Sequence, residues 1–491
     1  MGVYPYPPTG IIHPMAAPEN FPKMNSRWKL RPNERRTLLL IMDLAIAILS
    51  LVISLYFWAR GDQWLDFSWE FLKQRPPGWF FLLPVFWIIL MVELYDDRRS
   101  ADWRETLRGI ATAALVGLGL YLIIFFFYRT PKTLPRRGVA SFFLTVSILT
   151  LAWRMLYIRM VTSPQFLRRV LLVGAGETGQ TILKIAKEVN PPPFQWVGII
   201  DDDPKKIGTL IERLPVFGGN DKLLEVVARE QVSEIIVAIS GEMQGSMFQA
   251  LLDAQELGII ITRMPIAYEE LLHRVPIRHL EADWILRSFV DQAHVSYFYE
   301  LGKRLVDILG GMVGVSLLII TLPILAPLIL IDDGWPIFYI QQRAGKGGQL
   351  YWIYKFRTMR TNAETDGQPK WAEENDARAT RIGRWLRKTH TDELPQFINV
   401  LRGEMSLVGP RAERPELVDW FQKYVPFYRA RLLVKPGITG WAQVNYGYAS
   451  TIDDTVMKLE YDLYYIRHRN LVTDFVIMLR TPATVIGFRG R

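Results

Sequence analysis

Four long apolar runs follow one another in the first third of the chain and constrain its fold most strongly. They cover residues 38–59, 78–95, 109–128 and 138–158. A helix rises about 1.5 Å per residue, so each run is about long enough to cross the ~30 Å hydrocarbon core of a bilayer. One such run could be a buried core helix. Four in one block predict a bundle of four transmembrane helices over residues 37–160.

The basic residues around these runs predict their orientation. Residues 1–36 form a proline-rich and then basic tail without the apolar core of a cleavable signal peptide, so the first run is expected to be an uncleaved anchor. Because cytoplasmic loops are rich in Lys and Arg, we expect a cytoplasmic N-terminus. The second outer loop, with Arg129, Lys132, Arg136 and Arg137, opposes this prediction. The supporting residues are Arg98, Arg99, Arg104 and Arg108, and then Arg159, Arg168 and Arg169.

The overall composition limits the classes of molecule that this protein is expected to bind. The net charge is +9, and half of the residues are hydrophobic although 22% are charged, which indicates membrane helices joined to soluble parts. A basic protein can bind nucleic acid, anionic lipid or phosphate compounds. No nucleic-acid-binding module is recognisable, so membrane lipids and phosphates are the expected partners. The chain has no cysteine, which excludes disulfides, thiolate zinc sites and a cysteine nucleophile.

An α/β pattern typical of a Rossmann-like domain follows over residues 168–290. A buried strand ends at Val173, a G-x-G-x-x-G sequence opens a helix, and an acidic residue follows the next strand. This context predicts a site for a nucleotide or NAD, with the acid on a ribose. Glycines also allow close packing of a helix on a strand without any ligand. The candidate ligand-binding residues are Gly174, Gly176, Gly179 and Asp201.

Adjacent carboxylates, Asp392 and Glu393, mark the most reactive stretch. Thr391 is a candidate N-cap, and Pro395 is tolerated in a first helical turn. The helix dipole is expected to keep both carboxylates ionised. The apolar face of this expected helix is Leu394, Phe397, Ile398 and Leu401, and the bracketing cations are Arg387, Lys388 and Arg411. Carboxylates beside cations suit chemistry on a phosphate, although acidic residues also favour helix starts for stability alone.

Several ordered motifs surround these carboxylates. They are Lys303-Arg304-x-x-Asp307, Tyr354-Lys355-Phe356-Arg357-Thr358-Met359, Leu407-Val408-Gly409-Pro410-Arg411 and Lys435-Pro436-Gly437-Ile438-Thr439-Gly440-Trp441. About 190 C-terminal residues with these motifs resemble the bacterial sugar transferases. The rest resembles the large members of that family. The resemblance implies a multidomain membrane protein: an N-terminal α-helical transmembrane bundle, an α/β Rossmann-like domain, and an α-rich monotopic catalytic domain over residues 297–491.

The resemblance also implies an activity and its site. These enzymes transfer a sugar-1-phosphate from a UDP-sugar to a polyprenyl phosphate such as undecaprenyl phosphate, releasing UMP, as the first membrane step of exopolysaccharide, capsule or O-antigen synthesis. By resemblance, Asp392 is the nucleophile that carries the phosphosugar covalently. Glu393 is the preferred Mg²⁺ ligand, with Asp392 the second candidate. The phosphate-binding residues implied by motif are Lys355, Arg357, Arg387 and Arg411.

Residues 308–331 have no charged residue and are long enough to span a bilayer, yet a crossing would separate the catalytic carboxylates from cytosolic UDP-sugars, so a re-entrant helix is expected over residues 304–331. The family has a re-entrant helix here. Pro323 and Pro327 remove backbone donors and can break such a helix. Lys303 and Arg304 are expected to contact phospholipid headgroups. The expected location is the bacterial inner membrane, with the catalytic domain in the cytoplasm. Residues 462–491 are expected to form an interfacial amphipathic helix, with core packing as the alternative.

Two other functions remain open from the sequence. The spacing of Tyr299 and Lys303 matches NAD-dependent dehydrogenases and nucleotide-sugar dehydratases, so a membrane-tethered dehydratase or epimerase is the main alternative. A non-catalytic scaffold that senses nucleotides is the other. The sequence does not identify the transferred sugar. A homodimer is a guess from the size of the accessory region.

Overall fold

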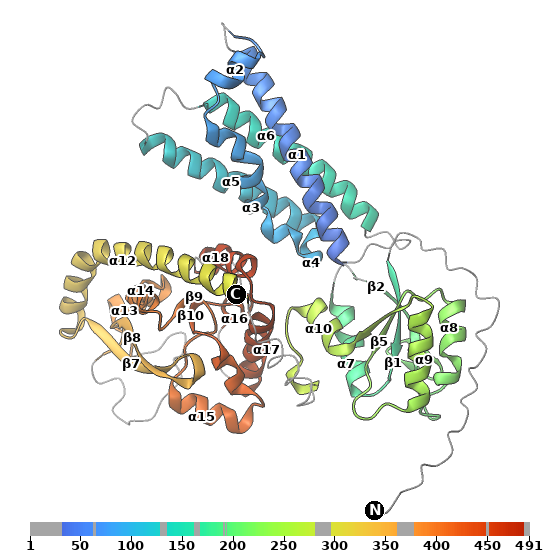
Figure 1. The fold of residues 1–491 in the computed structure, drawn as a ribbon. Coiled ribbons are helices and arrows are strands. Elements are labelled where there is room, and N and C mark those ends of the chain that lie inside the picture. Colours follow the sequence, from blue (N-terminus) through green and yellow to red (C-terminus); the bar gives the residue numbers. More distant parts are fainter. Residues whose placement is uncertain are drawn as a thin grey trace, which may run out of the picture. The chain divides into compact units, whose positions relative to one another are not determined.

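The computed structural model describes residues 32–61, 65–127, 135–161, 167–189, 192, 194–279, 296–360, 378–447 and 451–485. The chain divides into two compact units, Met1–Met264 and Pro265–Arg491, which are described separately (Figure 1). Parts of several predictions lie outside the described residues: most of the N-terminal tail, much of the second outer loop, residues 280–295 and the last six residues.

Three helices of the first unit are long and apolar enough to cross a membrane: α1 (Pro32–Arg60), α5 (Trp103–Phe127) and α6 (Arg136–Val161). The second predicted span, residues 78–95, is not one continuous helix. It forms the 3-10 turn η1 (Gly78–Leu82), the short helix α3 (Leu83–Leu90) and the 3-10 turn η2 (Val92–Tyr95). Pro84 stands at the start of α3 and has no amide to donate to the turn before it, which explains the break. The short helices α2 (Trp69–Gln74) and α4 (Asp97–Ser100) flank these segments.

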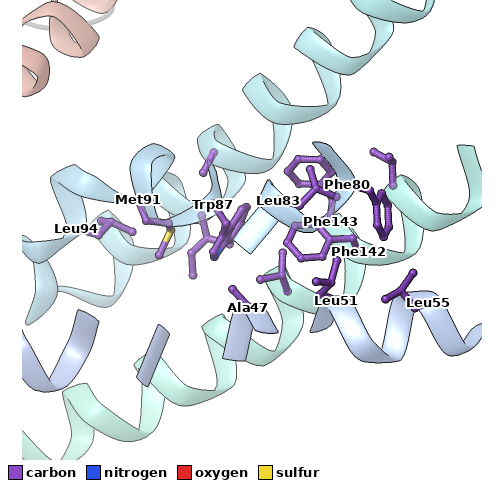
Figure 2. Packing of buried hydrophobic residues seen from close by; sticks show 14 of the residues in the cluster. Ala47, Leu51, Leu55, Phe80, Leu83, Trp87, Met91, Leu94, Phe142 and Phe143 are labelled. Atoms are coloured by element: carbon purple, nitrogen blue, oxygen red, sulfur yellow. The ribbon is translucent and has the colours of Figure 1, made fainter. Parts of the chain in front are cut away.

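A buried ion pair and an aromatic core hold these helices together. Arg154 on α6 donates to Asp43 on α1 at 2.6 Å, and neither side chain is exposed. Arg154 also donates to the backbone oxygen of Leu94 at 2.9 Å. Beside this pair, Trp87 of α3 packs against Phe143 of α6 in the apolar cluster of Figure 2. Losing one partner of a buried pair is costly, so this pair fixes the register of α1 on α6.

The α/β domain contains a six-stranded sheet in the order β3-β4-β2-β1-β5-β6. All neighbouring strands are parallel except β3 and β4. The strands are β1 (Arg168–Val173), β2 (Phe194–Ile200), β3 (Leu210–Ile211), β4 (Leu214–Gly218), β5 (Glu234–Val237) and β6 (Ile260–Arg263). Helices α8 (Leu223–Arg229) and α9 (Gly245–Glu256) share a core with Leu171 and Val173, and Figure 1 shows α7 (Glu177–Glu188) on the other side of the sheet. The predicted α/β pattern is confirmed.

The second unit is built around α12 (Tyr297–Asp333), one of the helices long and apolar enough to span a membrane. It also contains the antiparallel hairpin β7 (Phe338–Ala344) and β8 (Leu350–Phe356), and a parallel pair, β9 (Ser406–Val408) and β10 (Gly437–Thr439). Its helices are α10 (Met264–Leu272), which begins at the boundary, α13 (Arg381–Lys388), α14 (Gln396–Arg402), α15 (Pro415–Tyr424), α16 (Trp441–Asn445), α17 (Ile452–His468) and α18 (Leu471–Val485). Its 3-10 helices include η9 (Thr391–Glu393) and η10 (Tyr428–Leu433).

Glycines on α12 allow α14 to approach closely. A Cβ atom on Gly314 would lie 2.1 Å from the ring of Phe397, and one on Gly311 would lie 2.7 Å from Leu401. Both contacts are shorter than any real packing distance, so larger residues would push α14 away. Pro323 and Pro327 lie inside α12, and Figure 1 shows this helix changing direction along its length. Proline is the usual cause of such a bend.

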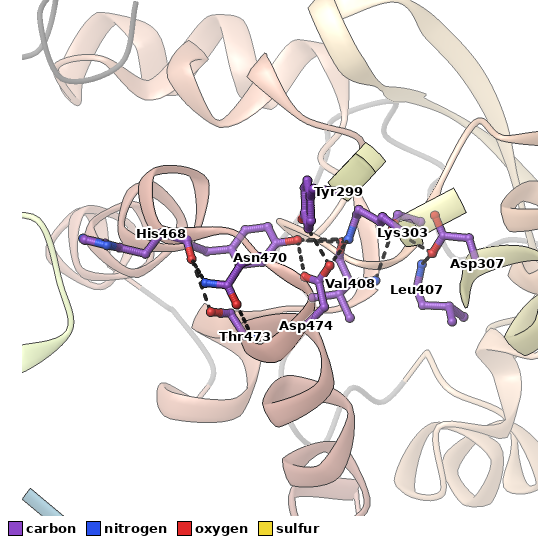
Figure 3. Close-up of polar contacts among 11 residues, drawn as sticks. Tyr299, Lys303, Asp307, Leu407, Val408, His468, Asn470, Thr473 and Asp474 are labelled. Atoms are coloured by element: carbon purple, nitrogen blue, oxygen red, sulfur yellow. Dashed lines mark hydrogen bonds and ion pairs between the residues drawn. The ribbon is translucent and has the colours of Figure 1, made fainter. Parts of the chain in front are cut away.

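The structure corrects the predicted role of Lys303 as a headgroup contact. Its ammonium donates to Asp474 of α18 at 2.9 Å and to the backbone oxygen of Val408 at 3.0 Å (Figure 3). Tyr299 donates to the same Asp474 carboxylate at 3.1 Å. Arg304 is also used internally, because it donates to the last backbone oxygens of α14, at 2.8 and 2.7 Å. Both cations therefore tie α12 to the domain.

The end of the chain also packs inward. Ile477 is completely buried on α18, and Arg480 is nearly so. Arg480 donates to Asn445 at 3.2 Å and lies over the ring of Trp441. The described part of residues 462–491 therefore packs into the core of the domain, which was the alternative to an interfacial helix.

A buried carboxylate on α17 gives a pH-dependent prediction. Burial raises the pKa of Glu460 to about 7, despite the nearby Arg274 and a hydrogen bond from Tyr268 at 3.2 Å. Because the folded pKa exceeds the unfolded one, ionising Glu460 costs stability as the pH rises from about 4.5 to 7. Glu460→Gln is therefore expected to raise the free energy of unfolding of the second unit by about 1–3 kcal/mol at pH 8 and to change it little at pH 4.5. Thermal unfolding at both pH values tests this, and an equal effect at both would contradict it.

Candidate active site

The acidic pair lies in the 3-10 turn η9, one turn before α14, rather than in the first turn of that helix. His390 precedes it in a left-handed conformation (φ 53°), and Pro395 occupies the N-cap position of α14. The predicted N-cap, Thr391, makes no side-chain cap; its hydroxyl pairs with Thr389 instead. The expected helix start at Thr391 is therefore divided into η9 and α14, and Pro395, which has no amide hydrogen to donate, lies between them. Both carboxylates remain largely buried, each 8% exposed.

Glu393 is held by two cations from different elements. Lys355 of β8 donates to its Oε1 atom at 2.8 Å, and Arg411, just after β9, donates to the same atom at 2.7 Å. Burial alone would raise the pKa of Glu393, but Arg411 and Lys355 outweigh it and hold the pKa well below its usual value. Glu393 is therefore an ionised anchor for both cations. The structure brings together four of the predicted site residues.

Asp392 has a different environment. Its carboxylate makes no hydrogen bond or ion pair with any residue that the structure describes. Burial raises its pKa, although Lys355 and Arg411 oppose this effect. The two adjacent acids thus differ in environment, and whether both are ionised stays a prediction. A more basic and unpaired carboxylate is the better nucleophile of the two.

Arg357 lies away from this pair. It donates to the backbone oxygens of Asp333 and Gly334 at 2.8 and 2.5 Å, and so caps the C-terminal end of α12. The motif implied that Arg357 faces the same site as Lys355, but Arg357 follows the end of β8 at Phe356 and points to the end of α12 instead. Arg387 is half-buried on α13, and within the described parts of the chain its guanidinium has no ion pair. Its role in phosphate binding stays a prediction.

The residues that support Arg411 from behind lie in no sequence motif. Arg431 on η10 is 7% exposed and donates to the backbone oxygen of Arg411 at 3.1 Å and to Asp462 of α17 at 2.9 Å. Burial raises the pKa of Asp462 to about 6, even beside Arg431. No local pattern links residues on η10 and α17, so nothing in the sequence marked this support.

The donor atoms of the site suit a hard divalent cation. Asp392 and Glu393 are adjacent and offer only oxygen, and no group of three or more His, Cys, Asp or Glu residues gathers among the residues described. Mg²⁺ is typically held by one or two carboxylates together with substrate phosphates, so two carboxylates fit it. The cations already on Glu393 compete there with a metal ion, which makes Asp392 the less encumbered ligand.

Comparisons with known proteins find relatives of both the C-terminal part and the α/β part of the chain. The sequence model of the family described as bacterial sugar transferase matches residues 298–488, and that of a CoA-binding domain matches residues 91–265. A UDP-N-acetylgalactosamine-undecaprenyl-phosphate N-acetylgalactosaminephosphotransferase of Aeromonas hydrophila is 43% identical over 224 residues, which are 45% of this chain and 52% of that protein.

Two further relatives match over longer stretches. A UDP-glucose:undecaprenyl-phosphate glucose-1-phosphate transferase of Xanthomonas campestris pv. campestris is 30% identical over 65% of this chain and 67% of its own length. The galactosyl transferase CpsE of Streptococcus agalactiae is 28% identical over 83% of this chain and 92% of its own. The chain therefore belongs to the bacterial sugar transferase family.

Proposed function

We propose that this protein transfers a sugar-1-phosphate from a UDP-sugar to undecaprenyl phosphate, giving undecaprenyl-diphosphate-sugar and UMP. The observation that carries the proposal is the carboxylate of Asp392, which has no hydrogen bond or ion pair among the residues that the structure describes, beside Glu393, which binds Lys355 and Arg411. Two of the relatives above are named for UDP-sugars and undecaprenyl phosphate, which supports the same substrates here.

The transfer takes two displacements at one phosphorus atom. A carboxylate oxygen of Asp392 attacks the sugar-bearing phosphorus, the bond to the UMP oxygen breaks, and UMP leaves with the electron pair. An oxygen of undecaprenyl phosphate then attacks the same phosphorus, and the carboxylate of Asp392 is the leaving group. Lys355 and Arg411 lie where they offset the charge on the phosphoryl oxygens in both steps.

A screen of UDP-sugars with undecaprenyl phosphate and Mg²⁺, read as UMP release, tests this function directly. At least one UDP-sugar is expected to give UMP in amounts that match the lipid-linked product. UMP release from none of them, by protein that is folded in nanodiscs, would contradict the proposal.

We expect Asp392 and Glu393 to hold a Mg²⁺ ion together with the donor diphosphate, whose charge the ion would offset. EDTA is therefore expected to lower UMP release at least 100-fold, and added Mg²⁺ to restore it. Thermal unfolding in EDTA is the control, because an unchanged unfolding temperature separates loss of the ion from loss of the fold. Full turnover in EDTA would contradict a metal role.

In the membrane, the proposed arrangement has α12 entering and leaving on the cytoplasmic side of the bacterial inner membrane, with a bend at Pro323 or Pro327. This leaves Asp392 beside the inner leaflet, where UDP-sugars and the lipid phosphate can both reach it. The bend of α12 and the two prolines within it support this arrangement. Labelling of a cysteine at Trp335, which is 73% exposed just after α12 in a chain that otherwise has no cysteine, tests it: labelling from the cytoplasmic side is expected, and labelling only from the opposite side would contradict it.

For the α/β domain we propose an accessory role, because neither displacement at phosphorus requires one of its residues. The Asp201 carboxylate accepts the amide of Ala175 at 2.6 Å, so one loop donor that could face a phosphate is already used. Close packing explains why positions 174 and 179 are glycines, because Cβ atoms on Gly174 and Gly179 would lie 2.8 and 2.0 Å from backbone oxygens. Binding of a nucleotide, NAD or CoA is thus not needed to explain these glycines.

The dehydratase alternative finds no support in the surroundings of Tyr299 and Lys303. Both side chains donate to the Asp474 carboxylate. In a dehydratase this pair would face the substrate and the cofactor. Copurification of NAD together with an altered sugar product would favour that alternative.

A further inference from the structure

A buried side-chain amide with an unused donor follows the acidic pair. Gln396 is the first residue of α14 and is 3% exposed. Its Nε2 atom is buried and has no hydrogen-bond partner in the described parts of the chain. A buried donor without an acceptor lowers the stability of a protein, so such donors are uncommon in native structures. This donor therefore needs an explanation other than the stability of the fold.

The backbone places this amide about one turn after Asp392. Leu394 and Pro395, which connect η9 to α14, both have right-handed helical dihedral angles, with φ of −54° and −61°. The amide of Phe397 donates to the backbone oxygen of Leu394 at 3.2 Å, so the helical turns continue across the junction. Side chains on a helix lean toward its N-terminal end. Gln396 is therefore expected to lean toward the turn that holds Asp392.

Contacts on either side of Gln396 show which surface it faces. Glu393 pairs with Lys355 of β8 at 2.8 Å. Asn399 accepts the amide of Tyr354, also on β8, at 3.3 Å. Glu393 and Asn399 precede and follow Gln396 by three residues, so the three side chains share one face of the helical segment. Gln396 therefore belongs to the face that packs against β8, beside Lys355.

Asp392 offers the matching acceptor. Glu393 already accepts hydrogen bonds from two cations, whereas the carboxylate of Asp392 has no partner among the residues described. A glutamine one turn from an aspartate is a hydrogen-bonding pair that helices use. Hydrogen bonds of catalytic groups are often made only when the substrate is bound. The unused donor and the unused acceptor thus complement each other, and rotation of the two side chains would join them.

We propose that Gln396 is a positioning residue for the nucleophile: when the UDP-sugar binds, its amide donates to one carboxylate oxygen of Asp392 and leaves the other oxygen to attack the phosphorus. This inference rests on the proposed function and deepens it by assigning how the nucleophile is oriented. A hydrogen bond to a charged group is strong enough to select one orientation of the carboxylate, and correct orientation accelerates the attack. Because its donor is buried, Gln396 acts through Asp392 and does not touch the substrate.

Gln396→Met keeps the length of the side chain and removes the donor. Because this donor is unpaired in the structure, the unfolding temperature is expected to stay the same or to rise. With a donor labelled in its sugar and no lipid, the maximal rate of labelling of Asp392 is expected to fall roughly 10- to 100-fold, as for loss of a hydrogen bond to a charged group. The donor concentration that gives half of the maximal rate should change less than about twofold, since the substituted residue does not contact the substrate.

Two further variants complete the test. Gln396→Glu keeps the shape of the amide but places an oxygen where the donor stood, so its labelling rate should fall at least as far. Gln422→Met is the control, because Gln422 is exposed on α15, and it should leave labelling and unfolding unchanged. Labelling by folded Gln396→Met at the rate of the unaltered protein would overturn the proposal. So would labelling that falls only in step with the folded fraction, which indicates a structural role. Failure of the proposed function is distinct, because the unaltered protein would then release no UMP.

Discussion

Asp392→Asn is expected to reduce UMP release by at least 1,000-fold. The amide has the shape of the carboxylate but cannot form the acyl phosphate, and loss of a covalent nucleophile typically costs several orders of magnitude. Because Asp392 has no hydrogen bond or ion pair among the described residues, the substitution should leave the fold unchanged. UMP release and thermal unfolding, measured together in nanodiscs, check both expectations.

Two controls make the Asp392 result specific. Asp419→Asn changes an exposed acid of α15, paired with Arg429 at 3.4 Å, and should leave turnover intact. A donor labelled in its sugar, supplied without lipid, should label the unaltered protein and not Asp392→Asn. Turnover without any labelled adduct would rule out the covalent mechanism, as would full activity of the Asn variant.

Lys303→Met is expected to destabilise the second unit by about 3–5 kcal/mol. It would leave the Asp474 carboxylate, whose side chain is 5% exposed, without its cation. Tyr299 and Tyr465 would still donate to this carboxylate, at 3.1 and 2.7 Å, which favours the lower end of the range. Denaturant or thermal unfolding of the full chain in nanodiscs measures the loss.

The double variant Lys303→Met/Asp474→Asn is the informative comparison. Removing the charge as well should recover more than half of the lost stability, because the penalty comes from an unpaired buried carboxylate. If Lys303 instead contacted lipid headgroups, the single variant would unfold as the unaltered protein does, and its stability would depend on the anionic lipid content.

Local sequence patterns were enough for several parts of the site. Asp392, Glu393, Lys355 and Arg411 could be named because each lies in a short motif, and the structure brings all four together. The strands beginning near Val170, Val197 and Glu234 could be predicted because a short apolar run followed by glycine or acidic residues is a local signal for a buried strand. Their pairing order required the tertiary structure.

Other features depended on contacts between distant residues. Arg357 follows the end of β8 and caps α12, which no alternation rule could predict. Lys303 contacts a residue 171 positions away, and Arg431 supports Arg411 from 20 positions away. The sequence by itself located the acidic pair and the strands of the α/β domain, since these depend on neighbours along the chain. Only the tertiary structure decided which cations bind Glu393 and which bind helix ends or buried acids. The reason is that a charged side chain pairs with the group that the packing places beside it.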